Sequence, residues 1–250
     1  MKNASILLIG ALLFSGSQVC AQQQADSSLR RNTIKLDITS HWLYRNAVVI
    51  AYERTLAKRP YQSWGILAGI QQFPSVGNLS NANVIREKDA GGFKLGAEYR
   101  FYLQKENKYK APRGVYVGPY TTFHSYTNSR LIEVDNDGVL EYADMESDLS
   151  IFNIGVQLGY QFVINNRWAI DLVFIGPSVS NYRFKTSLVG NYTFDPDEVT
   201  NDVVQGLIDQ FPGFEELLDE GEFASNGRVN TWAYGYRYQF QVGYHFGRKK

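Results

Sequence analysis

The segment Trp232-Ala-Tyr-Gly-Tyr-Arg-Tyr-Gln-Phe-Gln-Val-Gly-Tyr-His-Phe246 carries an aromatic or aliphatic residue at every second position. A period of two is typical of a β-strand, because successive side chains of a strand point to opposite faces. The residues in between are mostly polar or glycine, among them Arg237, Gln239 and Gln241. The segment therefore predicts one long strand with an apolar face and a polar face.

The same alternation occurs in seven earlier stretches, over 34–42, 48–52, 64–70, 93–101, 115–123, 152–162 and 168–174. Eight such strands predict an all-β fold, an eight-stranded antiparallel transmembrane β-barrel. Volume decides which face is inside. The interior of an eight-stranded barrel is just wide enough for side chains to fill, and the apolar face has too many aromatic rings for it. We therefore expect the apolar face to meet lipid and the polar face to line the lumen.

The predicted lumen face carries equal numbers of cations and anions. These residues are Lys35, Asp37, Glu53, Lys94, Glu98, Arg100, Asp171 and Arg237. A buried charge without a partner is costly, so balance favours a closed, ion-paired plug. The alternative is a gate that opens a narrow pore.

The connections and the tryptophans predict how the strands are oriented. Short turns are expected on the periplasmic side at about 57–62, 104–113 and 164–167, and outer loops at about 44–46, 73–90, 128–148 and 183–229. Outer-membrane barrels combine short periplasmic turns with longer outer loops. All four tryptophans then lie at strand ends, in the interface girdles. They are Trp42 and Trp232 at the outer interface, and Trp64 and Trp168 at the periplasmic one.

The N-terminus predicts export. Lys2 precedes an apolar stretch, and Val19-Cys20-Ala21 fits a signal-peptidase site. We expect residues 1–21 to be a cleaved signal peptide and residues 22–250 to form one outer-membrane barrel domain. Cleavage there removes the single cysteine, and with it disulfides and thiolate chemistry. The formal net charge of +0 gives no support for nucleic-acid binding.

The last outer loop is expected to contain helices over about 195–222. Asp195-Pro196 can begin a helix, and an apolar stripe follows at a spacing of four residues, formed by Val199, Val203, Leu207 and Phe211. The stripe predicts either a lid on the barrel mouth or an element that binds a partner. The acids of loops 128–148 and 183–229 are either simply solvated or hold divalent cations near lipopolysaccharide phosphates.

Two short motifs contain residue types that are found in chemical sites. Glu133-x-Asp135-x-Asp137-Gly138 resembles the start of a calcium loop, but the alternation around Asn136-Asp137-Gly138 favours a hairpin tip. His124-Ser125 offers a base and a nucleophile, yet adjacent strand residues point to opposite faces and cannot hydrogen-bond as such a pair. We predict no catalytic residue, no cofactor and no metal site.

Several motifs resemble the uncharacterised small outer-membrane barrels classed as a domain of unknown function, which are OmpA/OmpX-like eight-stranded barrels. The resemblance is carried by Lys35-Leu36, Tyr52-Glu53-Arg54, Gly114-Val115-Tyr116-Val117-Gly118-Pro119-Tyr120, Gly159-Tyr160-Gln161, Asn166-Arg167 and Gly176-Pro177. It implies the barrel fold and an outer-membrane location, and it implies no catalytic residues. One departure is the end of the chain, where Gly-Arg-Lys-Lys follows Phe246.

The sequence thus predicts a non-enzymatic integral outer-membrane barrel with a plugged polar lumen. Its expected role is structural, or it binds a partner through acidic outer loops. The expected partners are outer-membrane lipids, lipopolysaccharide and an unidentified extracellular molecule. The alternatives are a pore for small solutes and a lipid-modifying enzyme of the outer membrane.

Overall fold

The computed structural model describes residues 30–44, 46–72, 83–136, 139–190 and 228–247. The elements are β1 (Asn32–Asp37), α2 (Ile38–Leu43), β2 (Val48–Thr55), β3 (Gln62–Ile70), β4 (Asn83–Tyr102), β5 (Gly114–Asn136), β6 (Val139–Ile164), β7 (Trp168–Val189) and β8 (Arg228–Phe246). The expected signal peptide over 1–21 and the expected helical stripe of Val199, Val203, Leu207 and Phe211 lie outside the described residues.

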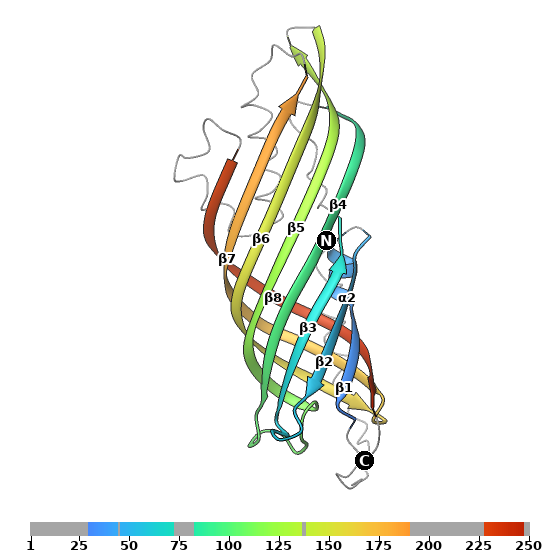
Figure 1. Cartoon of the computed structure of the whole chain (residues 1–250), viewed down its shortest axis with the longest axis vertical. Helices are drawn as coiled ribbons and strands as arrows, with labels where there is room; N and C mark the ends of the chain where they lie inside the picture. Colours follow the sequence, from blue (N-terminus) through green and yellow to red (C-terminus); the bar gives the residue numbers. More distant parts are fainter. Residues whose placement is uncertain (1–29, 45, 73–82, 137–138, 191–227, 248–250) are drawn as a thin grey trace, which may run out of the picture. The chain divides into compact units, whose positions relative to one another are not determined.

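Each strand pairs antiparallel with the next, and β8 returns to pair with β1 (Figure 1). The prediction of eight antiparallel strands is confirmed, and the ring is closed. Alternation sorts the side chains as expected. Lys35 is 2% exposed on the inner face of β1, whereas its neighbour Ile34 is 45% exposed. On β8, the side chain of Tyr234 is 79% exposed.

The connections at one end of the ring are short, over 56–61, 103–113 and 165–167. We call this the turn end, and the opposite end the hairpin end. The tightest turn has Asn165 and Asn166 in the left-handed region, with φ values of 51° and 53°. Asparagine tolerates this conformation better than most residues, and two such residues in succession let the chain reverse between β6 and β7.

The hairpin end differs from its prediction, because the expected loop over 128–148 is paired strand. The register of β5 and β6 continues without a break as far as Asn136 and Val139. The predicted hairpin is therefore confirmed for the two strands on either side of its tip. In the described part of the chain, no group of three or more possible metal ligands occurs. The exposed Tyr142 pairs with Glu133, whose carboxylate accepts a hydrogen bond and raises the pKa of that phenol. The expected loops at 73–90 and 183–229 are also shorter, since β4 begins at Asn83 and β7 reaches Val189.

The first predicted strand is also wrong beyond Asp37, where the helix α2 replaces it. The Asp37 carboxylate accepts hydrogen bonds from the Ser40 amide at 3.1 Å and from the Ser40 hydroxyl at 2.6 Å. This is an N-cap, and it stabilises a helical turn in place of further strand. Trp42 therefore projects from α2, 73% exposed, and the neighbouring His41 is exposed too.

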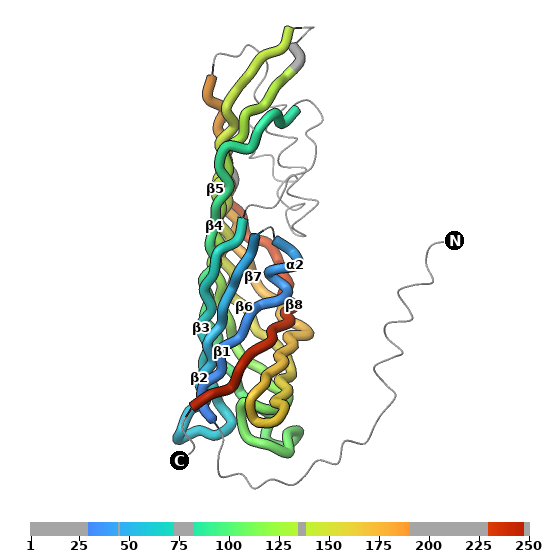
Figure 2. The backbone as a smooth tube through the Cα atoms, turned by 90° about the vertical axis from the view of Figure 1, so that its right-hand side faces the viewer, coloured from blue at the N-terminus to red at the C-terminus, as the bar shows by residue number. Residues whose placement is uncertain are grey.

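The strands differ in length, and this decides where the wall of the ring is complete. Strands β1, β2 and β3 are short, whereas β4 to β8 run on toward the hairpin end (Figures 1 and 2). Figure 2 shows α2 at the hairpin end of β1, beside β8. In the described ranges, no helix is long and apolar enough to cross a membrane.

Candidate functional site

The polar interior of the ring is the candidate site, and all eight predicted charges lie in it. Lys35 and Asp37 come from β1 and Glu53 from β2, while Lys94, Glu98 and Arg100 lie on the same face of β4. Asp171 and Arg237 come from β7 and β8. The side chains of these eight residues are between 0% and 11% exposed. The network therefore crosses the lumen between strands that are far apart in the sequence.

The group nearest the turn end is centred on Asp171. Its Oδ2 atom lies 2.5 Å from the Lys35 ammonium and 2.6 Å from Nη1 of Arg100. Lys35 also pairs with Glu53 at 2.6 Å, and Arg100 lies 3.5 Å from the same Glu53 oxygen. Two anions and two cations are thus interleaved, so each charge has two neighbours of opposite sign.

Neutral side chains supply further hydrogen bonds to this group. Ser63 and Tyr102 donate to Glu53 Oε1 at 2.6 and 2.8 Å, and Tyr116 donates to Asp171 Oδ1 at 2.7 Å. The Gln161 carbonyl oxygen accepts from Lys35 and Arg100, at 3.0 Å from each. Buried ions need such partners, because their attraction offsets desolvation only when the remaining lone pairs and protons are also satisfied.

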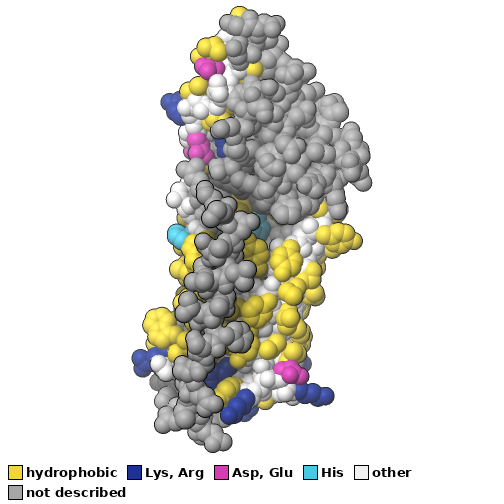
Figure 3. All heavy atoms as spheres, turned by 180° about the vertical axis from the view of Figure 1, so that it is seen from behind, with side chains coloured by type: hydrophobic (Ala, Val, Ile, Leu, Met, Phe, Trp, Pro, Cys, Tyr) yellow, Lys and Arg dark blue, Asp and Glu magenta, His cyan; other side chains and the backbone are white. Residues whose placement is uncertain are grey.

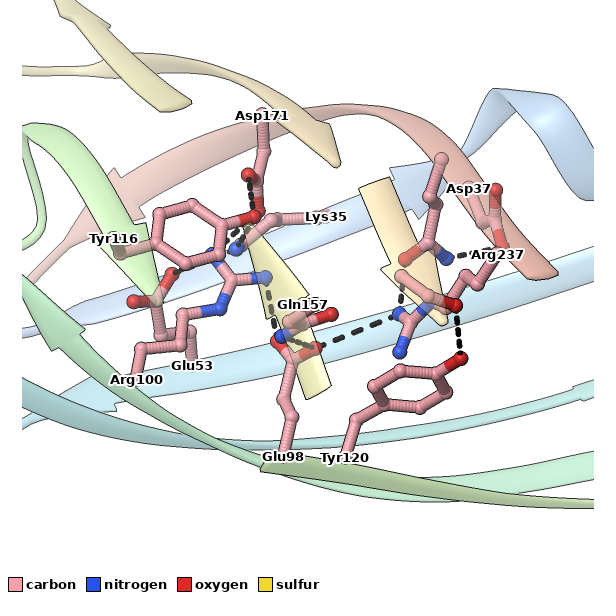
Figure 4. A network of polar contacts seen from close by, with 12 residues as sticks. Lys35, Asp37, Glu53, Glu98, Arg100, Tyr116, Tyr120, Gln157, Asp171 and Arg237 are labelled. Atoms are coloured by element: carbon pink, nitrogen blue, oxygen red, sulfur yellow. Dashed lines mark hydrogen bonds and ion pairs between the residues drawn. The ribbon is translucent and has the colours of Figure 1, made fainter. Parts of the chain in front are cut away.

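A second group lies toward the hairpin end and is joined to the first by Arg100. The other guanidinium nitrogen of Arg100 contacts Glu98 at 2.5 Å. Glu98 accepts from Gln157 at 3.0 Å and lies 3.5 Å from Arg237 (Figure 4). Arg237 donates to Gln239, which in turn donates to Asp37 at 2.6 Å. Asp37 pairs with Lys94 at 3.3 Å, so the eight charges form one connected network.

Aromatic rings hold the two arginines in place. The Arg100 guanidinium lies over the ring of Tyr116, 4.2 Å from its centroid, and Arg237 lies 4.7 Å from the centroid of Tyr120. Sequence reasoning did not include these tyrosines in the site. The signal was present, because Val115 and Val117 define the outward face of β5 and so place Tyr116 and Tyr120 inside.

A close approach of two strands fixes Tyr116. Gly159 faces it across the β5–β6 pair, and a Cβ atom there would collide with the Tyr116 phenol and with the backbone carbonyl of Leu172. Glycine is therefore required for the phenol to reach Asp171. The lumen is filled by large side chains, and the glycines opposite them make room.

The tryptophans and histidines complete the set of predicted positions. Trp168 and Trp232 are 55% and 58% exposed on the outer face, and Trp64, on β3, is half-buried against Tyr52. His124 faces the lumen and its Nδ1 lies 2.8 Å from the Gln71 amide, while Ser125 lies on the other face of β5. His245 is fully buried beside Thr33 at the turn end. These histidines lie on separate parts of the ring.

The arrangement keeps the charges of the network in place. The carboxylates of the group around Asp171 are engaged by cations and phenols. Their balanced charges leave the group neutral when all four are ionised. Such a network of buried polar groups makes the interior of the ring rigid.

Residues 75–185 match a family model described as a protein of unknown function (DUF3575). The matched range contains all of β4, β5 and β6 and most of β7, and so four of the eight network charges, Lys94, Glu98, Arg100 and Asp171. The predicted similarity to a domain of unknown function is thereby confirmed. No curated protein and no solved structure gives a significant match. The closer likeness to OmpA/OmpX-type barrels has no support in these comparisons.

Proposed function

We propose that this protein is an integral outer-membrane β-barrel without catalytic activity. Its lumen is plugged by the ion-pair network, and it acts from the membrane and the cell surface, in a structural role or by binding a partner. The observation that carries the proposal is the inverted burial of the ring. Charged side chains such as Arg100 are fully buried, whereas aromatic residues such as Tyr236 are 60% exposed on the outside.

The outer face supports membrane insertion. Ile66, Ile154 and Phe174 are each more than half exposed, and similar residues surround the ring. Figure 3 shows hydrophobic side chains over the described surface of the lower half of one face, with Lys and Arg side chains gathered at its lower edge. Apolar surface left in water costs about 25 cal/mol per Å². A hydrocarbon environment removes that cost, and a closed ring satisfies the backbone hydrogen bonds of its strands internally.

The lumen supports a closed barrel rather than an open channel. Eight strands leave an interior that side chains just fill. Here Arg100, Tyr116 and Lys35 are among the largest fully buried side chains of the described residues. An ion entering the lumen would have to separate ion pairs of 2.5 to 2.6 Å. We expect no measurable conductance from the wild-type protein.

Depth-dependent fluorescence quenching tests the membrane insertion. Two variants keep a single tryptophan, either Trp168 or Trp232, with the other three changed to Phe. Both residues are more than half exposed on the outer face, at opposite ends of the ring. In bilayers with brominated lipids, we expect bromines near the headgroups to quench both variants more strongly than bromines at the bilayer centre. Equal fluorescence with and without brominated lipid would contradict insertion.

Planar-bilayer recording tests the plug and separates it from the pore alternative. Conductance of the wild-type protein would favour the pore. In a double variant, Glu98→Ala with Arg100→Ala, an ion pair of 2.5 Å leaves the lumen with no change in net charge. We expect current steps from this variant. The matched control is Lys88→Ala with Asp144→Ala, which removes an exposed ion pair of the same length, and it should stay silent.

The proposed surface role rests on the β5–β6 hairpin and on the acidic sequence over 195–222. Deleting 196–222 should leave a folded barrel that still shifts on a gel after heating, since the eight strands lie outside the deletion. An unfolded product would show that this loop is required for the fold. Identical mass spectra of lipid A from cells with and without the protein would support the absence of lipid-modifying activity.

A further inference from the structure

Within the described residues, the pairing of β1 with β8 ends well short of the hairpin end. Their pairing runs from Asn32 with Phe246 to Asp37 with Gln241, and there β1 ends. Strand β8 begins at Arg228, so in the described part of the chain its residues 228–240 pair only with β7. Unpaired strand edges are costly in hydrocarbon, because lipid offers no hydrogen-bond partners. This stretch of β8 therefore needs another kind of neighbour.

Helix α2 is that neighbour at the Phe240 end of the stretch. The Thr39 hydroxyl accepts a hydrogen bond from the Phe240 amide at 2.7 Å, which takes the place of the next strand bond. The ring of Trp42 packs against that of Phe240, with centroids 6.3 Å apart. Above Phe240, the outward-facing Tyr236 and Tyr238 are 60% and 55% exposed.

A cavity of about 160 Å³ lies directly behind this part of the wall. Its inner lining combines polar residues, among them Lys94, His124, Ser178 and Arg237, with Ile151 and Tyr182, whereas Leu43, Tyr236 and Tyr238 line it from the wall. These last residues are also exposed on the outside of the ring. The cavity therefore borders both the lumen and the surface between α2 and β8.

The charges of the lining favour an anion. The lining contains one carboxylate, Asp37, and two cations, Lys94 and Arg237. Asp37 is already engaged, because Oδ2 accepts from Ser40 and Gln239 at 2.6 Å and pairs with Lys94 at 3.3 Å. The ion pair of Arg237 with Glu98 is loose, at 3.5 Å, and Nη1 of Arg237 has no hydrogen-bond partner within the described ranges. One positive charge of the lining is thus weakly compensated.

We propose that this cavity binds the headgroup of a single-chain anionic amphiphile, a fatty-acid carboxylate being the probe. The acyl chain leaves between α2 and β8, across Leu43 and Tyr238, into the surrounding lipid. Because a water molecule occupies about 30 Å³ of liquid, the cavity holds roughly five water volumes. That is room for a carboxylate and the first carbons of a chain, and the rest must lie outside. The proposal rests on the proposed membrane insertion.

The test uses the full chain in phosphatidylcholine nanodiscs and a fatty acid with a photoreactive diazirine in its chain. After irradiation, mass spectrometry of peptides locates the label. We expect it on residues 39–44 and 235–240, with excess oleate removing most of it. Acetate at the same concentration should leave the label, because the chain contributes to binding. Neutral oleyl alcohol should also leave the label in place, because binding depends on the negative charge of the headgroup.

Matched variants separate the cavity from the lipid-facing wall. Ser178→Phe fills the cavity without a change in charge and should lower labelling at least about tenfold. Ser150→Phe makes the same change on the outward face of β6 and should leave labelling within about twofold. Arg237→Gln removes the weakly compensated cation and should lower competition by oleate.

Three results would overturn the proposal. They are label spread evenly around the outer wall, unchanged labelling of Ser178→Phe, and competition by oleyl alcohol equal to that by oleate. Equal competition by acetate would show a site for free anions in which the chain has no part. Failure of the wild-type protein to insert into nanodiscs is a separate result, and it would count against the proposed function.

Discussion

Asp171 accepts from two cations through one oxygen, with Lys35 at 2.5 Å and Arg100 at 2.6 Å from its Oδ2 atom. The three residues come from β7, β1 and β4, which do not neighbour one another in the ring. Their contact therefore spans the lumen. It couples β1 and β7 to β4 across the ring, and it makes the stability of the barrel depend on a few charges.

Removing Asp171 should be strongly destabilising. Asp171→Leu leaves Lys35 and Arg100 with Glu53 as their shared anion nearby, and an uncompensated buried charge costs about 3–5 kcal/mol. The midpoint of urea unfolding in micelles measures the effect. Asp144→Leu is the control, because its ion pair with Lys88 is exposed and should be worth less than about 1 kcal/mol. Equal losses in both variants would contradict a special role for the buried network.

The pair Lys35 and Glu53 should be energetically coupled. Each single variant, Lys35→Met or Glu53→Gln, leaves its former partner in excess, whereas the double variant restores charge balance. Glutamine keeps an oxygen that can accept from Ser63 and Tyr102. We expect the double variant to lose about 0.5–3 kcal/mol less than the sum of the single losses. Simple additivity in a double-mutant cycle would show that the two charges act independently.

Gly159 should tolerate no side chain, whereas Gly91 should. Gly159→Ala drives a methyl group into the Tyr116 phenol and the Leu172 carbonyl, and overpacking of this kind costs about 1–3 kcal/mol. At Gly91 the nearest atom, in Thr127, is 3.5 Å from the new Cβ, so Gly91→Ala is the matched control. Adding Tyr116→Phe to Gly159→Ala should recover part of the lost stability, because it removes the colliding hydroxyl. The effect on all three variants is measured by the folding yield and by the midpoint of thermal unfolding.

The Thr39 hydroxyl should protect the amide of Phe240. Thr39→Val keeps the shape of the side chain and removes the acceptor that lies 2.7 Å from that amide. A hydrogen bond has a net worth of about 1 kcal/mol, so we expect hydrogen exchange at Phe240 to become about fivefold faster. Residues 241–246 of β8 pair with β1 and serve as the internal control. Unchanged exchange at Phe240 would mean that α2 does not protect the edge of β8.

Several features were readable from local sequence because they depend on alternation. In β4, Lys94, Glu98 and Arg100 alternate with Phe93, Leu95 and Phe101, and one face of a strand is set as soon as the other is known. The same reasoning places Tyr116 and Tyr120 inside, although they were not counted among the network residues. The equal numbers of cations and anions on the inner faces of the strands also indicated that these charges neutralise one another.

The end of β1 shows where local reasoning fails. Residues 38–42 were interpreted as strand, but Asp37 caps a helix instead. The capping carboxylate is held by Lys94 of β4 and Gln239 of β8, which are remote in the sequence. The prediction of strand length was wrong for a similar reason. How far β5 and β6 extend beyond residue 128 depends on the pairing of the two strands with each other.

The sequence by itself determined the eight strands and the face on which most of their predicted residues lie, because a strand's period of two needs no partner to be read. Only the tertiary structure decided which charges meet, where the pairing of β1 with β8 ends and where the cavity lies. Those features follow from the register and relative length of strands that become neighbours only when the ring closes.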